Sequence, residues 1–257
     1  MTAIRRSAIE AAIGLVPIAL LLALWFAVAT SGLAPPALLP APQTVLLRLF
    51  RLLGDPQFLA HCAVTLFRLF TGFAIAAVLG IAIGIAAAGN RAVAAAVTPL
   101  VRVLAPVPKV ALYPALVLTL GFEHSSKIAL VVADALFPIL LATYQGAAAV
   151  EPKLVWSARA AGVSQIRCLF TVVLRAALPA IMTGCRIGLV ISCIVVFLAE
   201  MITSTDGLGH MLVRAARNFQ TVDMFVPIIA ISLLGLALNA GFNALRARLL
   251  VGYPEEA

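Results

Sequence analysis

Charge is scarce in this chain. Of its 257 residues, 11% are charged and 63% are hydrophobic, against roughly 45–50% apolar residues in soluble domains. A composition so poor in charge excludes an ordinary soluble domain. The long runs of Leu, Ala, Ile and Val favour membrane-crossing helices over the alternating pattern of a barrel strand. We therefore predict an all-α, polytopic membrane protein.

Sequence patterns for bound groups are also missing. The chain has no G-x-x-x-x-G-K-[ST] segment for nucleotide phosphates. Its four cysteines and three histidines are scattered, without the paired spacing of a metal site or a redox pair. Its acidic residues are mostly isolated, which disfavours a membrane enzyme. We expect no catalytic residue, no metal and no cofactor in this chain, so that any ATP must be bound by another polypeptide.

Six apolar stretches are long enough to cross a bilayer. We place them at residues 13–30, 62–88, 94–120, 128–149, 171–202 and 224–245. The first is too long for a typical signal peptide and is expected to remain as an anchor. The predicted domains are an N-terminal segment (1–12), the anchor helix (13–30), an outer segment (31–61), a core of five helices (62–245) and a C-terminal tail (246–257).

Basic residues predict the orientation, because they favour the cytoplasmic side of short loops. With the N-terminus inside, nine lie inside and five outside. The inner ones are Arg5, Arg6, Arg91, Lys153, Arg159, Arg167, Arg175, Arg246 and Arg248, and the outer ones are Arg48, Arg51, Lys127, Arg214 and Arg217. Both termini are therefore predicted to be cytosolic. The net charge of +8 then fits the anionic lipid of the inner leaflet and needs no nucleic-acid partner.

The outer segment carries a helical pattern. Residues 44–53 are amphipathic, as in an interfacial helix, although the stretch can also be read as a plain connection.

The second span has glycines at helical spacing. Gly80, Gly84 and Gly89 form a stripe of small residues that lets helices approach closely. The spacing leaves open whether this stripe faces the same chain or a second copy.

The third span carries Pro99, Pro106, Pro108 and Pro114. Proline inside a helix removes a backbone hydrogen bond and bends the helix. We predict a broken helix, with Pro106 to Lys109 at the break and near a translocation path. The alternative is that the kinks only shape packing.

Ionisable residues inside spans are costly and are usually paired or functional. They are Arg68, Arg102, Lys109, Asp134, Arg186 and Glu200. Arg68 and Glu200 lie near the outer ends, from which their side chains can extend to the interface, and the residues leave this interpretation and a functional one equally open. Asp134 can form a structural pair with Arg186 or Lys109. Alternatively, the surplus of cations lowers the barrier to an anion, and Pro106, Pro108, Lys109, Asp134, Arg186 and Glu200 are then candidates for the translocation path.

A polar island, Glu151 to Pro179, interrupts the apolar runs on the predicted cytosolic side. Pro152 can begin a helix and Gly162 can end one, which predicts a helix of about ten residues, roughly 15 Å long. This helix is too short to cross a bilayer. Leu154 and Trp156 make it too apolar to lie free in water, so it is expected to bind a partner outside the membrane.

The island, with Gly162 followed by Leu174 and Pro179, resembles the coupling loop of bacterial ABC-importer permeases. Further motifs resemble the nitrate, sulfonate and taurine permease group over roughly residues 39–250. They are Leu39-Pro40-Ala41-Pro42, HCAVTLFRLFTG from His61 to Gly72, PVPKVAL from Pro106 to Leu112, Ser126-Lys127-Ile128, Phe137-Pro138-Ile139-Leu140, Ala199-Glu200-Met201 and Gly207-Leu208-Gly209. Two positions depart from the family pattern: Trp156 stands where Glu is usual, and Arg175 stands where Pro is usual.

The resemblance implies a type I permease fold and a transport subunit without enzymatic activity. It implies a second permease copy, a periplasmic binding protein that delivers the solute, and two cytosolic ATPase subunits that bind ATP and Mg²⁺. The loop 150–169, hereafter the coupling segment, would contact the ATPases through Leu154, Val155, Trp156, Ala158, Arg159, Ala161 and Gly162. The solute would be a small anion such as nitrate, a sulfonate or taurine. The residues alone leave open a secondary transporter that acts without an ATPase.

Overall fold

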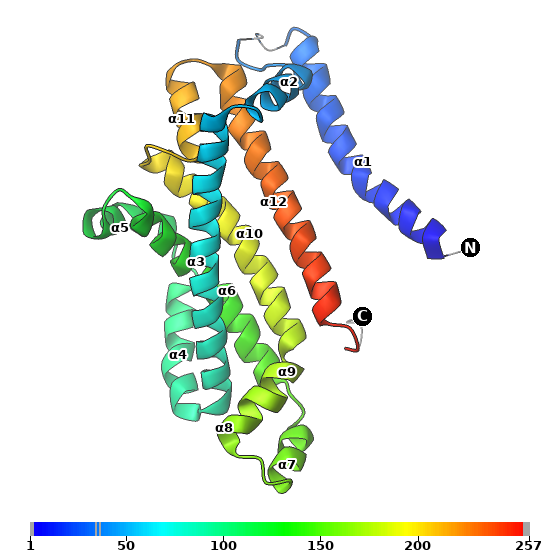
Figure 1. Ribbon diagram of the computed structural model, residues 1–257, viewed down its shortest axis with the longest axis vertical. Coiled ribbons are helices and arrows are strands. Elements are labelled where there is room, and N and C mark those ends of the chain that lie inside the picture. The colour runs from blue at the N-terminus through cyan, green and yellow to red at the C-terminus, as the bar shows by residue number, and fades with distance from the viewer. Residues whose placement is uncertain (1–2, 34, 36, 254–257) are drawn as a thin grey trace. The chain divides into compact units, whose positions relative to one another are not determined.

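The computed structural model describes residues 3–33, 35 and 37–253, with side chains described from residue 16 onward. All regular structure in these ranges is helical, which confirms the predicted fold class (Figure 1). The elements are α1 (Ala3–Thr30), α2 (Pro42–Leu52), α3 (Pro56–Gly89), α4 (Arg91–Leu104), the 3-10 turn η1 (Lys109–Leu112), α5 (Tyr113–Leu120), α6 (His124–Ala148), α7 (Pro152–Ala160), α8 (Gln165–Cys168), the π-helical turn η2 (Leu169–Val173), α9 (Leu174–Ala176), α10 (Leu178–Ile202), α11 (Leu208–Arg217) and α12 (Thr221–Leu249).

The chain forms two compact units. The first comprises Met1–Ala60 and Met211–Ala230, and the second comprises His61–His210 and Ile231–Ala257. Within the first unit, the Trp25 ring stacks on Phe225 with centroids 5.6 Å apart, and Arg48 Nε lies 2.6 Å from Asp223 Oδ1. The second unit contains every residue predicted for coupling or translocation. The predicted domains describe membrane topology and stay predictions.

Four described helices are long and apolar enough to cross a membrane: α3, α6, α10 and α12. Helix α4 and the η1–α5 segment make a fifth span if they are counted together, and they meet at an angle of 86°. In α1, the stretch with described side chains, Val16–Thr30, is apolar but shorter than these spans. The predicted second, fourth and sixth spans thus correspond to α3, α6 and α12.

The break in the third span lies where the prolines predicted it. Helix α4 ends at Leu104, and the next helical residues begin at Lys109, so Pro106 and Pro108 lie in the bend. Pro99 lies inside α4, whereas Pro114 stands in the first turn of α5, where a proline needs no N–H partner. The predicted broken helix is therefore confirmed.

The fifth span begins later than predicted. Its long helix α10 starts at Leu178, not at residue 171. The preceding residues form the π-helical turn η2 and the three-residue helix α9. Hydropathy does not distinguish these from a continuous helix, because the change concerns backbone hydrogen bonding and not side-chain polarity.

Glycines let α3 and α10 pack closely on α6. A Cβ added at Gly80 of α3 would lie 2.9 Å from a side-chain carbon of Ile139, and one at Gly84 would lie 2.7 Å from Thr143 Cβ. On α10, one at Gly188 would lie 2.7 Å from another carbon of Ile139. Because lipid tails are as apolar as the helix surfaces, burial of apolar surface does not drive helices together in a membrane. Close van der Waals packing therefore stabilises these helix contacts. At these positions, the glycine stripe therefore faces a helix of its own chain.

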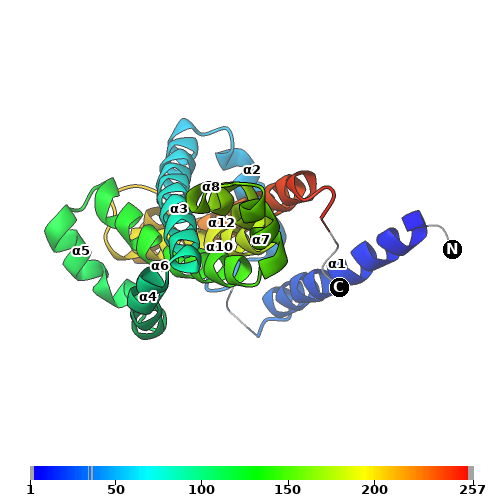
Figure 2. The same ribbon diagram turned by 90° about the horizontal axis from the view of Figure 1, so that it is seen from below.

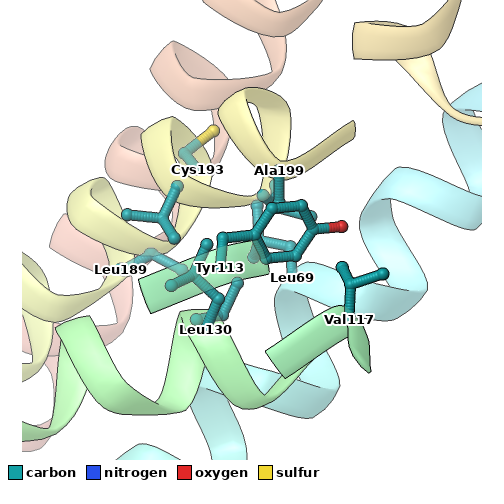
Figure 3. Packing of buried hydrophobic residues seen from close by; sticks show 10 residues of the cluster. Leu69, Tyr113, Val117, Leu130, Leu189, Cys193 and Ala199 are labelled. Carbon is teal, nitrogen blue, oxygen red and sulfur yellow. The ribbon is translucent and has the colours of Figure 1, made fainter. Parts of the chain in front are cut away.

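A buried aromatic ring joins several elements of the second unit. Tyr113 is fully buried and packs among residues of α3, α5, α6 and α10, which include Leu69, Val117, Leu130, Leu189, Cys193 and Ala199 (Figure 3). Its hydroxyl accepts a hydrogen bond of 3.1 Å from Thr203 Oγ1. This contact fixes the start of α5 against the end of α10.

Replacing Gly84 with Val should destabilise the second unit by about 1–3 kcal/mol, because the added side chain overpacks the contact with α6. The matched control is Gly241→Val in α12, where an added Cβ meets no atom within 4 Å. The measurement is the unfolding midpoint of the purified protein in detergent. Equal midpoints for the two variants would contradict the close-packing account.

Candidate functional site

The predicted short helix in the coupling segment is present. Helix α7 has nine residues, Pro152–Ala160, with Pro152 in its first turn. Gly162 has φ +81°, its N–H donates to Arg159 O at 3.0 Å, and the N–H of Val163 donates to Ala158 O at 3.1 Å. These two hydrogen bonds satisfy carbonyl groups at the end of α7 and form a Schellman motif. The motif requires a positive φ at position 162, which glycine adopts readily. The predicted helix and its glycine stop are confirmed.

The side chains of α7 divide between two directions. Val155 is half-buried and packs against a core cluster of the second unit. Trp156 and Leu154 remain 67% and 49% exposed. The other predicted coupling residues are Ala158, Arg159, Ala161 and Gly162, of which Ala158 is half-buried and the rest are exposed. All seven lie on one projecting segment, and their contact with an ATPase stays a prediction.

A pocket of about 250 Å³ lies between α7 and the helix ends behind it. Its lining includes Gly89 at the end of α3 and Ala148 at the end of α6. Arg159 of α7 and Gln165 of α8 also line it. Figure 2 looks along the second unit from this end. The coupling segment is therefore not packed solidly against the membrane helices.

The chain between α7 and α10 contains two interruptions. The first is the π-helical turn Leu169–Val173, and the second is the break between α9 and α10 at Ala177. Single π-helical turns are frequent at functional sites. Arg175 lies between the interruptions, and its carbonyl accepts a hydrogen bond of 2.8 Å from the Tyr253 hydroxyl. This bond links the residues after α12 to the chain between α7 and α10.

At the other end of α10, a buried ion pair joins the helices. Arg68 of α3 and Glu200 of α10 are each 1% exposed, and Arg68 Nη1 lies 2.8 Å from Glu200 Oε1. Arg68 Nη2 also binds Asp206, and Arg68 Nε donates to His124 Nδ1 of α6 at 3.1 Å. The interpretation in which Arg68 and Glu200 reach the interface is therefore wrong. Their mutual neutralisation makes the burial of both charges tolerable.

The same carboxylate holds the loop after α10. Glu200 Oε2 accepts a hydrogen bond of 2.9 Å from Thr65 Oγ1 and one of 3.1 Å from the N–H of Gly209. The N–H of Gly207 donates to His61 Nδ1 at 3.0 Å. Gly207 has φ +95°, and a side chain there would collide with the Glu200 carboxylate. The loop consequently requires glycine at this position.

Asp206, outside the spans, is the second acid of this cluster. Burial alone would raise the pKa of its carboxyl group. The hydrogen bond and the charge of Arg68, together with the Ser204 hydroxyl and His124, outweigh burial and hold the pKa of Asp206 below its usual value. The carboxylate is therefore ionised at neutral pH.

The charges predicted for the translocation path are not gathered in one place. Lys109 lies at the bend, with Nζ 3.6 Å from Asp134 Oδ1, 2.9 Å from Ala105 O and 4.6 Å from the centroid of the Phe137 ring. The structural pair of Asp134 is thus with Lys109 and not with Arg186. Pro106 and Pro108 lie beside it in the bend, while Glu200 belongs to the buried cluster. Their place in a solute path stays a prediction.

Arg186 has a different partner. Its Nε donates to Asn239 Oδ1 of α12 at 3.0 Å, and its side chain is exposed. The sequence reasoning missed Asn239, although an amide inside an apolar span was a visible signal. It also missed Asp206, His124 and Thr65, which become neighbours of Arg68 only through folding.

Comparison with known proteins gives consistent matches. The model of the family described as "Binding-protein-dependent transport system inner membrane component" matches residues 79–250. The chain is 33% identical over 237 residues to the taurine transport system permease protein TauC of Escherichia coli K12, covering 90% of this chain and 86% of that protein. It is 31% identical over 237 residues to the putative aliphatic sulfonates transport permease protein SsuC of Bacillus subtilis 168, covering 92% and 86%.

Among solved structures, a chain of the MetNI methionine ABC transporter in an inward-facing conformation is similar. Its TM-score is 0.65 at 16% sequence identity, and the match covers 72% of this chain and 93% of that one. At this identity the likeness shows the fold alone.

Replacing Glu200 with Leu should destabilise the protein by about 3–5 kcal/mol, because it leaves the charge of Arg68 buried without its main partner. The double variant Arg68→Met/Glu200→Leu should recover part of this loss, since no charge of the pair remains. The measurement is denaturant unfolding in detergent. The exposed pair Lys153–Glu151, at 3.4 Å, is the control, and its removal should change stability by less than about 1 kcal/mol. A double variant no more stable than Glu200→Leu would contradict the account.

The lowered pKa of Asp206 predicts an acid-sensitive contribution to stability. This contribution is fully present above the unfolded-state pKa of about 3.9 and is lost as the pH falls through the lower folded-state value. The melting temperatures of the wild type and Asp206→Asn, measured from pH 7 to pH 3, should therefore differ by a constant amount above about pH 5 and converge below about pH 4. A constant difference down to pH 3 would count against the assignment.

Proposed function

The chain belongs to the family of binding-protein-dependent transport system inner membrane components, and we propose that it carries a small anion across the bacterial inner membrane. It is the permease subunit of an ABC importer, with the type I permease fold. The proposed solute class is nitrate, a sulfonate or a taurine-like molecule. The relatives named for taurine and aliphatic sulfonates support this class.

The proposed assembly has three kinds of protein component. Two copies of this chain form the path, two ATP-binding cassette subunits attach on the cytosolic side, and a periplasmic protein delivers the solute. ATP and Mg²⁺ are bound by the ATPase partner, and this chain holds no cofactor of its own. Both termini are cytosolic, in line with the excess of basic residues on that side.

Helix α7 is the single observation that carries the coupling role. It is bounded by Pro152 and by Gly162, and it keeps Trp156 at 67% exposure in a chain whose other segments are mostly membrane helices. An exposed aromatic residue on a short projecting helix favours a protein partner. Trp156 takes the place of the usual Glu, so the contact with the ATPase is apolar at this position.

Force would pass along the chain from α7 to α10. Closure of the ATPases displaces α7 as a body, because packed helices move between discrete arrangements and do not deform continuously. The pocket of about 250 Å³ behind α7 provides room for this displacement. The π-helical turn η2 and the break at Ala177 are the two places where the backbone can change direction before α10. Movement at α7 would thereby tilt the spans on either side, α6 and α10.

The secondary transporter left open by the residues alone has less support. The family model describes a component of a binding-protein-dependent system, and a secondary carrier has no use for the coupling segment. Solute transport by the reconstituted chain without an ATPase would restore that alternative.

Replacing Gly162 with Leu should uncouple transport from ATP hydrolysis. The variant must either strain the positive φ of +81°, at a cost of roughly 1–2 kcal/mol, or shift the end of α7 within the ATPase contact. We expect normal membrane insertion, at least a tenfold loss of solute uptake, and ATPase activity that no longer responds to the binding protein.

The matched control is Gly121→Leu. Gly121 ends α5 with φ +84°, and an added Cβ there, as at Gly162, meets no atom within 4 Å. Both variants therefore place leucine at a positive φ, and the ψ of 176° at Gly121 adds strain to the control, because glycine alone adopts that region readily. Only Gly162 lies in the coupling segment. Normal uptake by Gly162→Leu, or equal loss in both variants, would contradict the coupling role.

A further inference from the structure

The four cations that the sequence analysis placed inside spans fall into three groups according to what compensates their charge. Arg68 and Lys109 have carboxylate partners. Arg102 lies in the last turn of α4, where the unpaired carbonyl oxygens of a helix C-terminus favour a cation. Among the residues with described side chains, Arg186 has no carboxylate partner. It also lies far from a helix C-terminus, eight residues into the 25-residue helix α10 and about 12 Å from its start.

Asn239 orients Arg186 without neutralising it. The amide oxygen accepts the Nε–H of Arg186 at 3.0 Å. Among the residues with described side chains, this is the hydrogen bond that Arg186 makes, so both Nη groups remain for another acceptor. A charged side chain at this depth is costly in lipid and is normally found facing the protein interior or a water-filled cavity. The α10 face with Arg186 is therefore expected to line such a space.

An apolar groove lies directly beside this pair. It has a volume of about 310 Å³ and runs between α10 and the second-unit part of α12. Asn239 lines it, together with Leu189, Val190, Ile194, Phe197 and Leu238. The arrangement combines one oriented cation with space for a few carbon atoms, which is the chemistry that recognises an anionic group on a short apolar chain.

We propose that Arg186, oriented by Asn239, contacts the anionic group of the solute during passage, while the groove between α10 and α12 receives its carbon part. This proposal rests on the proposed function and narrows the solute to an organic oxyanion, such as a sulfonate or a carboxylate. Arginine suits the task because its planar guanidinium pairs two N–H groups with two oxygens at once. Lys109, already paired with Asp134, has no such role.

The test measures the charge preference of the space beside Arg186. Val190 lies four residues further on the same side of α10 and is 43% exposed. Val190→Cys is introduced into the full chain, which is reconstituted in vesicles with its ATPase subunits. The thiol is labelled with an anionic sulfonatoethyl and a cationic trimethylammonioethyl methanethiosulfonate. The labelling rate of protein with Val190 intact is subtracted to remove the four native cysteines.

With Arg186 present, the anionic reagent should react faster than the cationic one. Changing Arg186 to Gln should lower this ratio of rates by about 10-fold. Ethanesulfonate should slow the anionic labelling in the protein with Arg186 and not in Arg186→Gln. The control is Leu198→Cys, which lies about 18 Å from Arg186 along the helix, beyond the screening length of about 8–10 Å. Its ratio should be nearly unchanged.

Any of three results would overturn the proposal. They are no labelling of Val190→Cys by either reagent, the same ratio of anionic to cationic labelling rates with Arg186 and with Arg186→Gln, and no protection by ethanesulfonate. A lipid headgroup phosphate is the competing oxyanion. The same measurements in purely zwitterionic vesicles and in vesicles rich in phosphatidylglycerol distinguish the two sources. A preference that is lost in the anionic vesicles would assign Arg186 to the lipid, whereas an equal preference in both supports the solute.

Failure of the proposed function would be seen separately. It would appear as wild-type ATPase activity that does not respond to the binding protein. The charge preference at Val190→Cys is measured without ATP or binding protein, so its outcome does not depend on the outcome of the ATPase measurement.

Discussion

The buried pair of Arg68 and Glu200 is the interaction on which the end of the second unit farthest from α7 depends. A guanidinium and a carboxylate that are each 1% exposed attract strongly in a medium of low dielectric constant, and each would be costly without the other. Through Asp206, His124 and Thr65, the pair joins α3, α6, α10 and the loop before α11. Because its hydrogen bonds require several elements at once, this end of the unit is fixed as one body.

The coupling segment has the opposite character. Helix α7 keeps Trp156 and Leu154 exposed, a pocket lies behind it, and a π-helical turn separates it from α10. Between the two ends, glycines hold α3 and α10 against α6 at backbone distance. A unit that is fixed at one end, tightly packed along its length and open at the other end can transmit a displacement of α7 to the helices without unfolding.

Several features followed from the residues because they depend on local rules. Pro152 and Gly162 predicted the bounds of a short helix, since proline and glycine act on the backbone at their own positions. Pro106 and Pro108 predicted the bend in the third span for the same reason. The π-helical turn at Leu169–Val173 was missed and the start of α10 was placed at 171 instead of 178, because a change in backbone hydrogen bonding leaves apolar side chains apolar.

Composition, local spacing and contiguous motifs were enough to predict the membrane class, the helical spans, the short helix between Pro152 and Gly162 and the family resemblance. The pairing of the charges, in contrast, became defined only when the helices packed. Arg68 pairs with Glu200, which lies 132 positions away in the sequence. Asp134 pairs with Lys109, and Arg186 donates a hydrogen bond to the neutral Asn239. The energy of a charge pair depends on the distance between the two charges and on the dielectric constant around them. Both quantities are set by how the helices pack, and not by the positions of the residues in the sequence.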